Sequence, residues 1–163
     1  MLMKIQHKNT QIKFTSKGKS NPLILLHGFL ETEEIWRDYQ ELLSKNRQVV
    51  TIDLLGHGKT GNISEVHSME SMADAVIEVL DHLKIEKASF AGHSMGGYVI
   101  MEILKKYPEK ISKIRLINST PAEDTPEKKE NRDRVANLVA KNKSAFVSMA
   151  ISNLLTAENN KKF

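Results

Sequence analysis

The residues most able to do chemistry are a serine and its glycine neighbours near the middle of the chain. The segment Gly92-His93-Ser94-Met95-Gly96 follows a short apolar run and precedes an apolar pattern at helical spacing. A G-x-S-x-G between a strand and a helix predicts a sharp turn that lifts the serine hydroxyl above the sheet. The free N–H groups that open the helix point at the same place. The pattern therefore predicts Ser94 as a nucleophile beside an anion site.

Two further motifs follow predicted buried strands. Residues 23–26 are a continuous apolar run, typical of a strand covered on both faces, and end at the motif HGFL of residues 27–30. The next such run, residues 49–52, ends at the motif DLLGHG of residues 53–58. Strands that alternate with helices indicate a parallel sheet with helices on both faces, an α/β fold. Because the carboxyl ends of parallel strands share one edge, we expect these motifs and Ser94 to lie together.

The other elements follow from apolar spacing and from the positions of serine and proline. The sequence predicts a hairpin of residues 4–7 and 11–14, helices at 35–43 and 69–83, the second capped by Ser68, a helix after Ser94 that ends before Pro108, a strand at 114–118, and further helices from Thr125 and from Ser144.

Composition limits the classes of protein. The 163 residues are 40% hydrophobic and 27% charged, which fits a globular protein that is expected to be cytoplasmic and without a membrane partner. The chain has no cysteine, which excludes disulfides, and no metal-ligand spacing, so neither a metal nor another cofactor is expected. The net charge of +4 resides from Thr125 onward, and solvated helix faces explain it better than binding to nucleic acid or to an acidic membrane.

Together the three motifs resemble those of the α/β-hydrolase family, and the resemblance covers residues 23 to about 120. The overall look is similar to small monoacyl esterases and to the hydrolase-like lyases of menaquinone synthesis. The resemblance implies that Ser94 is the nucleophile and that the backbone N–H groups of Phe29 and Met95 form an oxyanion hole. Two such donors would stabilise the charge that develops as serine attacks an acyl carbon. A small-molecule ester, thioester or similar acyl compound is the expected substrate.

Other residues of these motifs are expected to support the loops. They are His27, Gly28, Gly92, His93 and Gly96. His27 is expected to hold its turn through hydrogen bonds, and Asp53 to order a loop as an acceptor rather than to act as the catalytic acid. His57 is expected to be a turn residue as well, and His7, His67 and His82 are expected at the surface. No aspartate stands at position 94, which disfavours dehalogenase and epoxide-hydrolase chemistry.

A catalytic histidine is missing from the sequence. In this family the triad runs in the order serine, acid, histidine, and no histidine follows His93. We therefore expect residues 1–120 to be the N-terminal part of a hydrolase core, truncated before its last strands, and residues 121–163 to be a helical segment that begins a cap. Such a chain would be inactive alone. A non-catalytic binding or interaction protein on the same scaffold is the alternative. If the chain lacks the last strands of the sheet, the strand at 114–118 would be an exposed edge that is open to self-association.

One more segment of the sequence suggests a different chemistry, that of phosphate binding. Gly58-Lys59-Thr60 follows a strand and matches the end of a phosphate-binding P-loop. That pattern requires glycine at position 53, where this chain has Asp53, and a carboxylate there would repel phosphate. The sequence therefore disfavours nucleotide binding.

Overall fold

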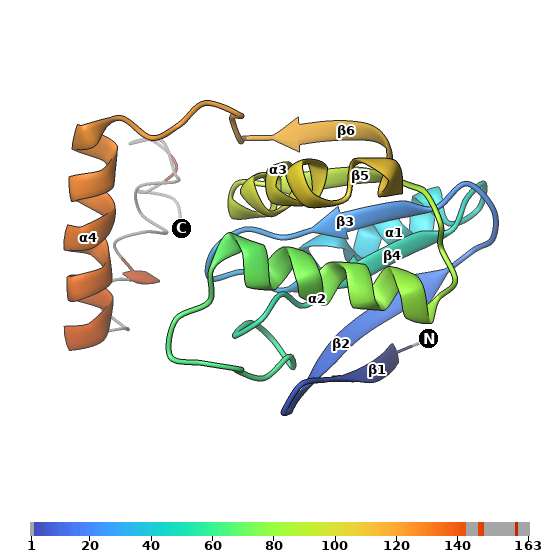
Figure 1. Cartoon of the computed structure of the whole chain (residues 1–163), viewed down its shortest axis with the longest axis horizontal. Helices are drawn as coiled ribbons and strands as arrows, with labels where there is room; N and C mark the ends of the chain where they lie inside the picture. Colours follow the sequence, from blue (N-terminus) through green and yellow to red (C-terminus); the bar gives the residue numbers. More distant parts are fainter. Residues whose placement is uncertain (1, 143–146, 149–158, 160–163) are drawn as a thin grey trace. The chain divides into compact units, whose positions relative to one another are not determined.

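The computed structural model describes residues 2–142, 147–148 and 159, which fall in two units. The first unit spans Met1–Pro121 and the second Ala122–Phe163. The motifs of the candidate site all belong to the first unit, which Figure 1 shows as a sheet with helices.

The first unit is built on a six-stranded sheet in the order β1-β2-β4-β3-β5-β6. Its strands are β1 (Leu2–His7), β2 (Thr10–Lys17), β3 (Leu23–Leu26), β4 (Val49–Ile52), β5 (Ala88–His93) and β6 (Ile111–Ile117). Strand β3 pairs in parallel with β4 and β5, and β5 with β6, whereas the β1–β2 hairpin joins β4 in antiparallel fashion. The predicted α/β class with a mostly parallel sheet is confirmed. Strand β6 begins three residues before the predicted strand because Ile111 already pairs with Ala88.

Helices cover both faces of this sheet (Figure 1). They are the short 3-10 turn η1 (Glu33–Trp36), α1 (Arg37–Leu43), α2 (Met69–His82), α3 (Met95–Lys106) and the 3-10 turn η2 (Pro108–Lys110). The side chains of β3 point alternately to the two faces of the sheet. Ile24 and Leu26 pack in the larger cluster with α2 and α3, and Leu23 and Leu25 pack with Trp36. As predicted, Ser68 caps α2, since its side chain accepts a hydrogen bond from the Ser71 N–H.

One of the three histidines that were expected at the surface is buried. The prediction for His7 is wrong: it is 1% exposed, because β1 lies against α2, and its Nδ1 lies 2.8 Å from Glu78 Oε2. His67 is half-buried and accepts a hydrogen bond from the Ile63 N–H at 3.1 Å. Only His82 is exposed as predicted. A histidine on a strand under a helix gives no sequence signal that separates it from a surface residue.

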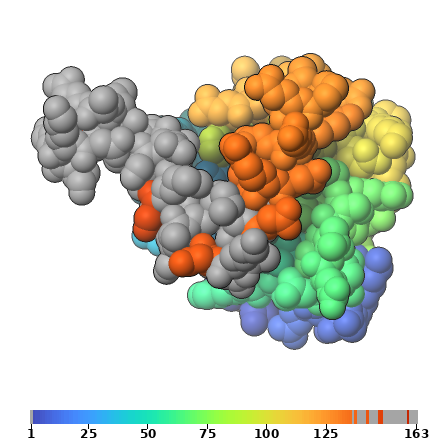
Figure 2. All heavy atoms as spheres, turned by 90° about the vertical axis from the view of Figure 1, so that its left-hand side faces the viewer, coloured from blue at the N-terminus to red at the C-terminus, as the bar shows by residue number. Residues whose placement is uncertain are grey.

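The second unit contains α4 (Pro126–Lys141), which appears in orange in Figure 2. The Thr125 hydroxyl accepts a hydrogen bond from the Lys128 N–H at 3.4 Å, as expected for the residue that opens this helix. The helix predicted from Ser144 begins outside the described residues, and the cap stays a prediction. Of the helices in the described ranges, none has the length and apolar character needed to span a membrane.

Candidate active site

Ser94 occupies a strained turn between a strand and a helix. Strand β5 ends at His93 and α3 begins at Met95, so a single residue changes the chain direction. Ser94 has φ +48° and ψ −114°, a conformation that residues with a Cβ rarely adopt and that costs of order 1–3 kcal/mol. Its N–H donates to the Ile117 carbonyl at 3.0 Å, and its own carbonyl accepts from the Gly97 N–H at 3.0 Å. The surrounding structure therefore holds the serine in this conformation.

Gly92 and Gly96 are glycines because three backbones meet at this turn. A Cβ on Gly92 would lie 2.5 Å from the carbonyl of Gly96, and one on Gly96 would lie 2.5 Å from the carbonyl oxygen of Leu26. Both distances are shorter than a real Cβ contact allows, so any side chain would push β3, β5 and α3 apart. This close approach brings the loop after β3 next to Ser94.

That loop, residues 27–33, lies directly against the serine. A Cβ added to Gly28 would lie 3.1 Å from Ser94 Cβ. Among the described residues, neither the Phe29 N–H nor the Met95 N–H donates a hydrogen bond. The Phe29 ring is half-exposed and packs edge-on against the His57 ring, 6.1 Å between centroids. Two backbone donors thus remain open on the segments that flank Ser94.

His27 fixes the beginning of the loop. It is fully buried, its Nε2 accepts from the Leu54 N–H at 3.0 Å, and its Nδ1 lies 2.7 Å from the Gly28 carbonyl. An Nε2 that accepts must be unprotonated, so Nδ1 carries the hydrogen and donates it to Gly28. Burial lowers the pKa of His27, against the opposing effect of the Gly28 hydrogen bond. His27 is therefore a neutral residue that ties β3 to the loop after β4.

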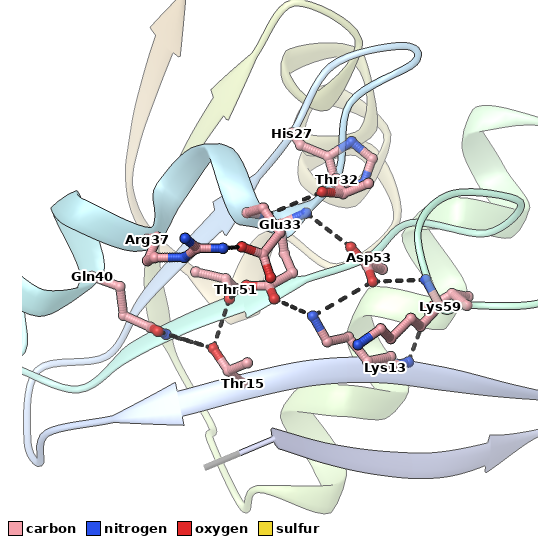
Figure 3. A network of polar contacts seen from close by, with 12 residues as sticks. Lys13, Thr15, His27, Thr32, Glu33, Arg37, Gln40, Thr51, Asp53 and Lys59 are labelled. Atoms are coloured by element: carbon pink, nitrogen blue, oxygen red, sulfur yellow. Dashed lines mark hydrogen bonds and ion pairs between the residues drawn. The ribbon is translucent and has the colours of Figure 1, made fainter.

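Asp53 fixes the end of the same loop (Figure 3). Its Oδ1 accepts from the Glu33 N–H at 2.8 Å and its Oδ2 from the Lys59 N–H at 2.9 Å. A Cβ on Gly58 would lie 2.4 Å from the Asp53 carboxyl carbon, so the residue 53–58 motif folds around this carboxylate. As expected from the sequence, Asp53 orders loops as an acceptor.

The P-loop alternative loses its structural basis here. The Thr60 hydroxyl, which a P-loop would turn toward a bound metal ion, is buried and accepts from the Lys13 N–H at 2.9 Å. The Lys59 N–H is bonded to Asp53 and is not free to hold phosphate. In the described parts of the chain, no three His, Asp or Glu side chains are grouped so that they could hold a metal ion.

A buried polar network beneath the loop is absent from the sequence-based prediction. The Lys13 ammonium forms an ion pair with Glu33 and lies 3.6 Å from Asp53 Oδ2. The Thr51 hydroxyl donates to Glu33 Oε2 at 2.6 Å. Figure 3 shows these side chains meeting between β2, β4 and η1. A lysine in the strand pattern of residues 10–17 reads as exposed, and only the Glu33 partner on a distant segment explains its burial.

Sequence analysis also missed Glu31, although it identified His93. Glu31 Oε2 accepts from the Gly28 N–H at 2.6 Å and lies 2.9 Å from His93 Nδ1. Both side chains are partly exposed, 28% for Glu31 and 26% for His93. The only signal in the sequence was the position of Glu31 shortly after the HGFL motif. This pair links the loop to the strand that carries Ser94.

Comparisons with known proteins identify the fold family. The family described as alpha/beta hydrolase fold matches residues 21–151. An esterase from Thermogutta terrifontis, described as thermophilic, superposes with a TM-score of 0.87 at 30% identity, covering 99% of this chain and 61% of that one.

Two curated relatives match over shorter ranges. The acetyltransferase component of an acetoin cleaving system from Pseudomonas putida is 36% identical over 98 residues, 60% of this chain and 26% of that protein. A Bacillus subtilis candidate 2-succinyl-6-hydroxy-2,4-cyclohexadiene-1-carboxylate synthase is 33% identical over 119 residues, 71% of this chain and 42% of that protein. The chain thus spans less than half the length of these curated relatives.

Proposed function

The chain belongs to the α/β-hydrolase fold family, and we propose that it carries the nucleophile half of a serine hydrolase active site for acyl substrates. In this proposal Ser94 is the nucleophile, and the N–H groups of Phe29 and Met95 form the oxyanion hole. The observation that carries it is the Ser94 backbone, which is held at φ +48° between β5 and α3. A strained residue kept in place by its surroundings is typical of a functional site.

The chemistry follows from these groups. The Ser94 oxygen forms a bond to the acyl carbon, and the carbonyl electron pair moves onto oxygen, where the two N–H groups stabilise the negative charge. Collapse of this intermediate breaks the bond to the alcohol or thiol, which leaves with a proton, and an acyl-serine remains. Water then attacks the acyl-serine, releases the acid and restores the hydroxyl. Esters are the simplest substrates for this sequence of steps, and the Thermogutta terrifontis relative is described as an esterase.

The proton on Ser94 requires a base, and the sequence has no histidine after His93. His27 is committed to the Leu54 N–H, and His93 points its Nδ1 at Glu31. Without its base a serine triad loses most of its acceleration. We therefore expect these 163 residues alone to turn over activated esters at near-background rates.

Hydrolysis of p-nitrophenyl acetate tests this expectation. The chain, Ser94→Ala and His57→Ala are compared, with Ser89→Ala on the same strand as a matched control. Equal rates near background support the proposal. A large rate that is lost in both Ser94→Ala and His57→Ala would show that the chain assembles its own base. A large rate that survives in Ser94→Ala would overturn Ser94 as the nucleophile.

Phenylboronic acid tests the site without requiring turnover. Its boron accepts an electron pair from a serine oxygen and becomes tetrahedral, which imitates the intermediate of acyl transfer. We expect the acid to shift the amide resonances of Phe29 and Met95 in the wild-type chain and to leave them unchanged in Ser94→Ala. The nucleophile assignment fails if no adduct forms or if the shifts persist in Ser94→Ala.

We further propose that a second copy of the chain pairs with the open side of β6. In the described sheet β6 is an edge strand bonded only to β5, and Ile117 on it is 37% exposed. An edge strand has unpaired N–H and C=O groups that can pair with another chain. We expect the apparent mass to rise with concentration in light scattering, and Ile117→Lys to suppress that rise. A monomer at every concentration would refute the proposal.

A further inference from the structure

The loop that carries Phe29 is tied down at three points, and they differ in kind. His27 and Asp53 hold its two ends to the segment after β4 through buried hydrogen bonds. The third tie is the partly exposed pair Glu31 and His93. Of the side-chain hydrogen bonds made by these three contacts, only the one between Glu31 and His93 reaches β5, the strand that precedes Ser94.

The contact between Glu31 and His93 lies close to Ser94 at Gly28. A Cβ placed on this glycine would lie 2.8 Å from Glu31 Oε2, 3.1 Å from His93 Nδ1 and 3.1 Å from Ser94 Cβ. A side chain at position 28 would therefore collide with the carboxylate, the imidazole and the serine side chain, so these three groups crowd around Gly28. Phe29, whose N–H belongs to the proposed oxyanion hole, is the next residue.

We propose that Glu31 and His93 are positioning residues that couple the oxyanion loop to the serine turn, so that the charge on His93 sets how the Phe29 and Met95 amides converge. This inference rests on the proposed function for its consequence, because convergence matters only if an oxyanion forms there. Neither residue touches the reacting atoms in the proposed mechanism. They act through Gly28 and through the backbone on either side of Ser94.

The coupling has a simple physical origin. A single carboxylate oxygen, Glu31 Oε2, accepts from both the Gly28 N–H and His93 Nδ1. When His93 gains a proton, its hydrogen bond to that oxygen becomes charge-assisted and stronger. The same oxygen then accepts less strongly from Gly28, and the loop adjusts. The adjustment therefore follows the protonation of His93.

Among the residues that the structure describes, the elements packed around this pair bring few other charged groups to it. Strand β6 places Ile117 opposite His93 and so brings no charge. On the other side of the loop His27, whose pKa burial lowers and the Glu31 charge acts to raise, lies 5.1 Å from His57 between ring centroids, and both rings also contact the segment after β4. Glu31 is thus the carboxylate that responds to His93.

Nuclear magnetic resonance of the whole chain tests the coupling without catalysis. Between pH 5 and 8 (roughly the range in which histidine titrates), we expect the Gly28, Phe29 and Met95 amides to shift with the midpoint of the His93 ring. In Glu31→Gln the chemical shifts of the Phe29 and Met95 amides should no longer change at the midpoint of the His93 ring. Glu34→Gln, an exposed neighbour paired with Arg37, is the matched control and should keep it. The proposal is overturned if the shifts of these amides do not change with the His93 ring in the wild type. It is also overturned if they change with that ring to the same extent in Glu31→Gln.

Two further measurements separate this proposal from the proposed function. His93→Gln can still donate to Glu31 but does not titrate, so it should abolish the pH response and retain binding of phenylboronic acid. Glu31→Gln should weaken that binding about three- to tenfold, the range for one misaligned hydrogen bond. If the wild type binds no boronic acid while its amides follow His93, the proposed function fails and the coupling stands. If it binds while the amides do not follow, only the coupling fails.

Discussion

Two carboxylates hold the same loop, and they do so in different surroundings. Asp53 is 1% exposed, accepts from the Glu33 and Lys59 N–H groups, and lies beside Lys13. Glu31 is 28% exposed and accepts from the Gly28 N–H beside His93. Each carboxylate accepts two hydrogen bonds, so the number of these bonds does not distinguish them.

Burial decides what each carboxylate does for the protein. When a partner of Asp53 is lost, water cannot replace it, and the full cost of an unpaired buried group appears in the free energy of unfolding. When a partner of Glu31 is lost, water takes its place and the cost is small. We conclude that Asp53 stabilises the fold of the loop, whereas Glu31 adjusts its position within that fold. The following substitutions test this distinction.

The largest expected effect is that of Asp53→Asn. An asparagine has one acceptor oxygen in place of two, and its NH₂ group would face a backbone N–H of Glu33 or Lys59. Because the site is buried and Lys13 would lose a counter-charge, we expect the free energy of unfolding to fall by about 3–5 kcal/mol. Urea denaturation measures this change. Asp38→Asn, exposed on α1, is the control and should change it by less than about 0.5 kcal/mol. A small loss in Asp53→Asn would remove the contrast between the two carboxylates.

A second expected effect concerns the other members of the buried network. Lys13→Met should cost about 3 kcal/mol, because it leaves the carboxylates of Glu33 and Asp53 without a buried cation. Adding Glu33→Gln removes one of these charges, so the double variant should be less destabilised than the sum of the single variants. A double-mutant cycle in urea gives the coupling, expected at about 1–3 kcal/mol. Simple additivity would mean that the ion pair contributes nothing specific.

The sequence was sufficient to predict the strands and the serine turn because their signals are local. The apolar run of residues 23–26, the glycines at 92 and 96 and the cap at Ser68 each act on their own segment, and the structure has β3, the turn and α2 there. Because the carboxyl ends of parallel strands share one edge of a sheet, the loop after β3 could be predicted to lie beside Ser94 without knowledge of any side-chain contact.

The partners in two polar contacts of the site could not be predicted, because these contacts join segments that are distant in sequence. Lys13 and Glu33 are 20 residues apart, and Glu31 and His93 are 62 apart. A lysine in a strand pattern and a glutamate in a loop both suggest solvent exposure until the tertiary partner is known. His7 was misplaced for the same reason, since the helix that buries it begins at Met69.

A smaller effect, on the pH dependence of stability, comes from His27. Burial lowers the pKa of its ring in the folded chain below the ordinary value of 6.5. Between the two values the unfolded chain binds more protons, so stability is complete above about pH 6.5 and falls as the pH drops through the folded value. Urea titrations at several pH values between 5 and 8 measure this slope. The slope should be smaller in His27→Gln. The part of the slope that remains is expected from His67, because burial also lowers the pKa of that ring. An unchanged slope would show that His27 is not the titrating group.

The smallest expected change in stability is that of Glu31→Gln, and it completes the comparison with Asp53. The glutamine retains an acceptor for the Gly28 N–H, and water reaches the position where the charge was. Exposed ion pairs contribute about 0–1 kcal/mol, so we expect the free energy of unfolding to fall by less than about 1 kcal/mol. The same urea titration used for Asp53→Asn gives both numbers under one set of conditions. The coupling proposed above requires that the Phe29 and Met95 amides change in this variant while its stability does not. A loss comparable to that of Asp53→Asn would mean that Glu31 supports the fold, and a change in the amides would then report partial unfolding rather than positioning.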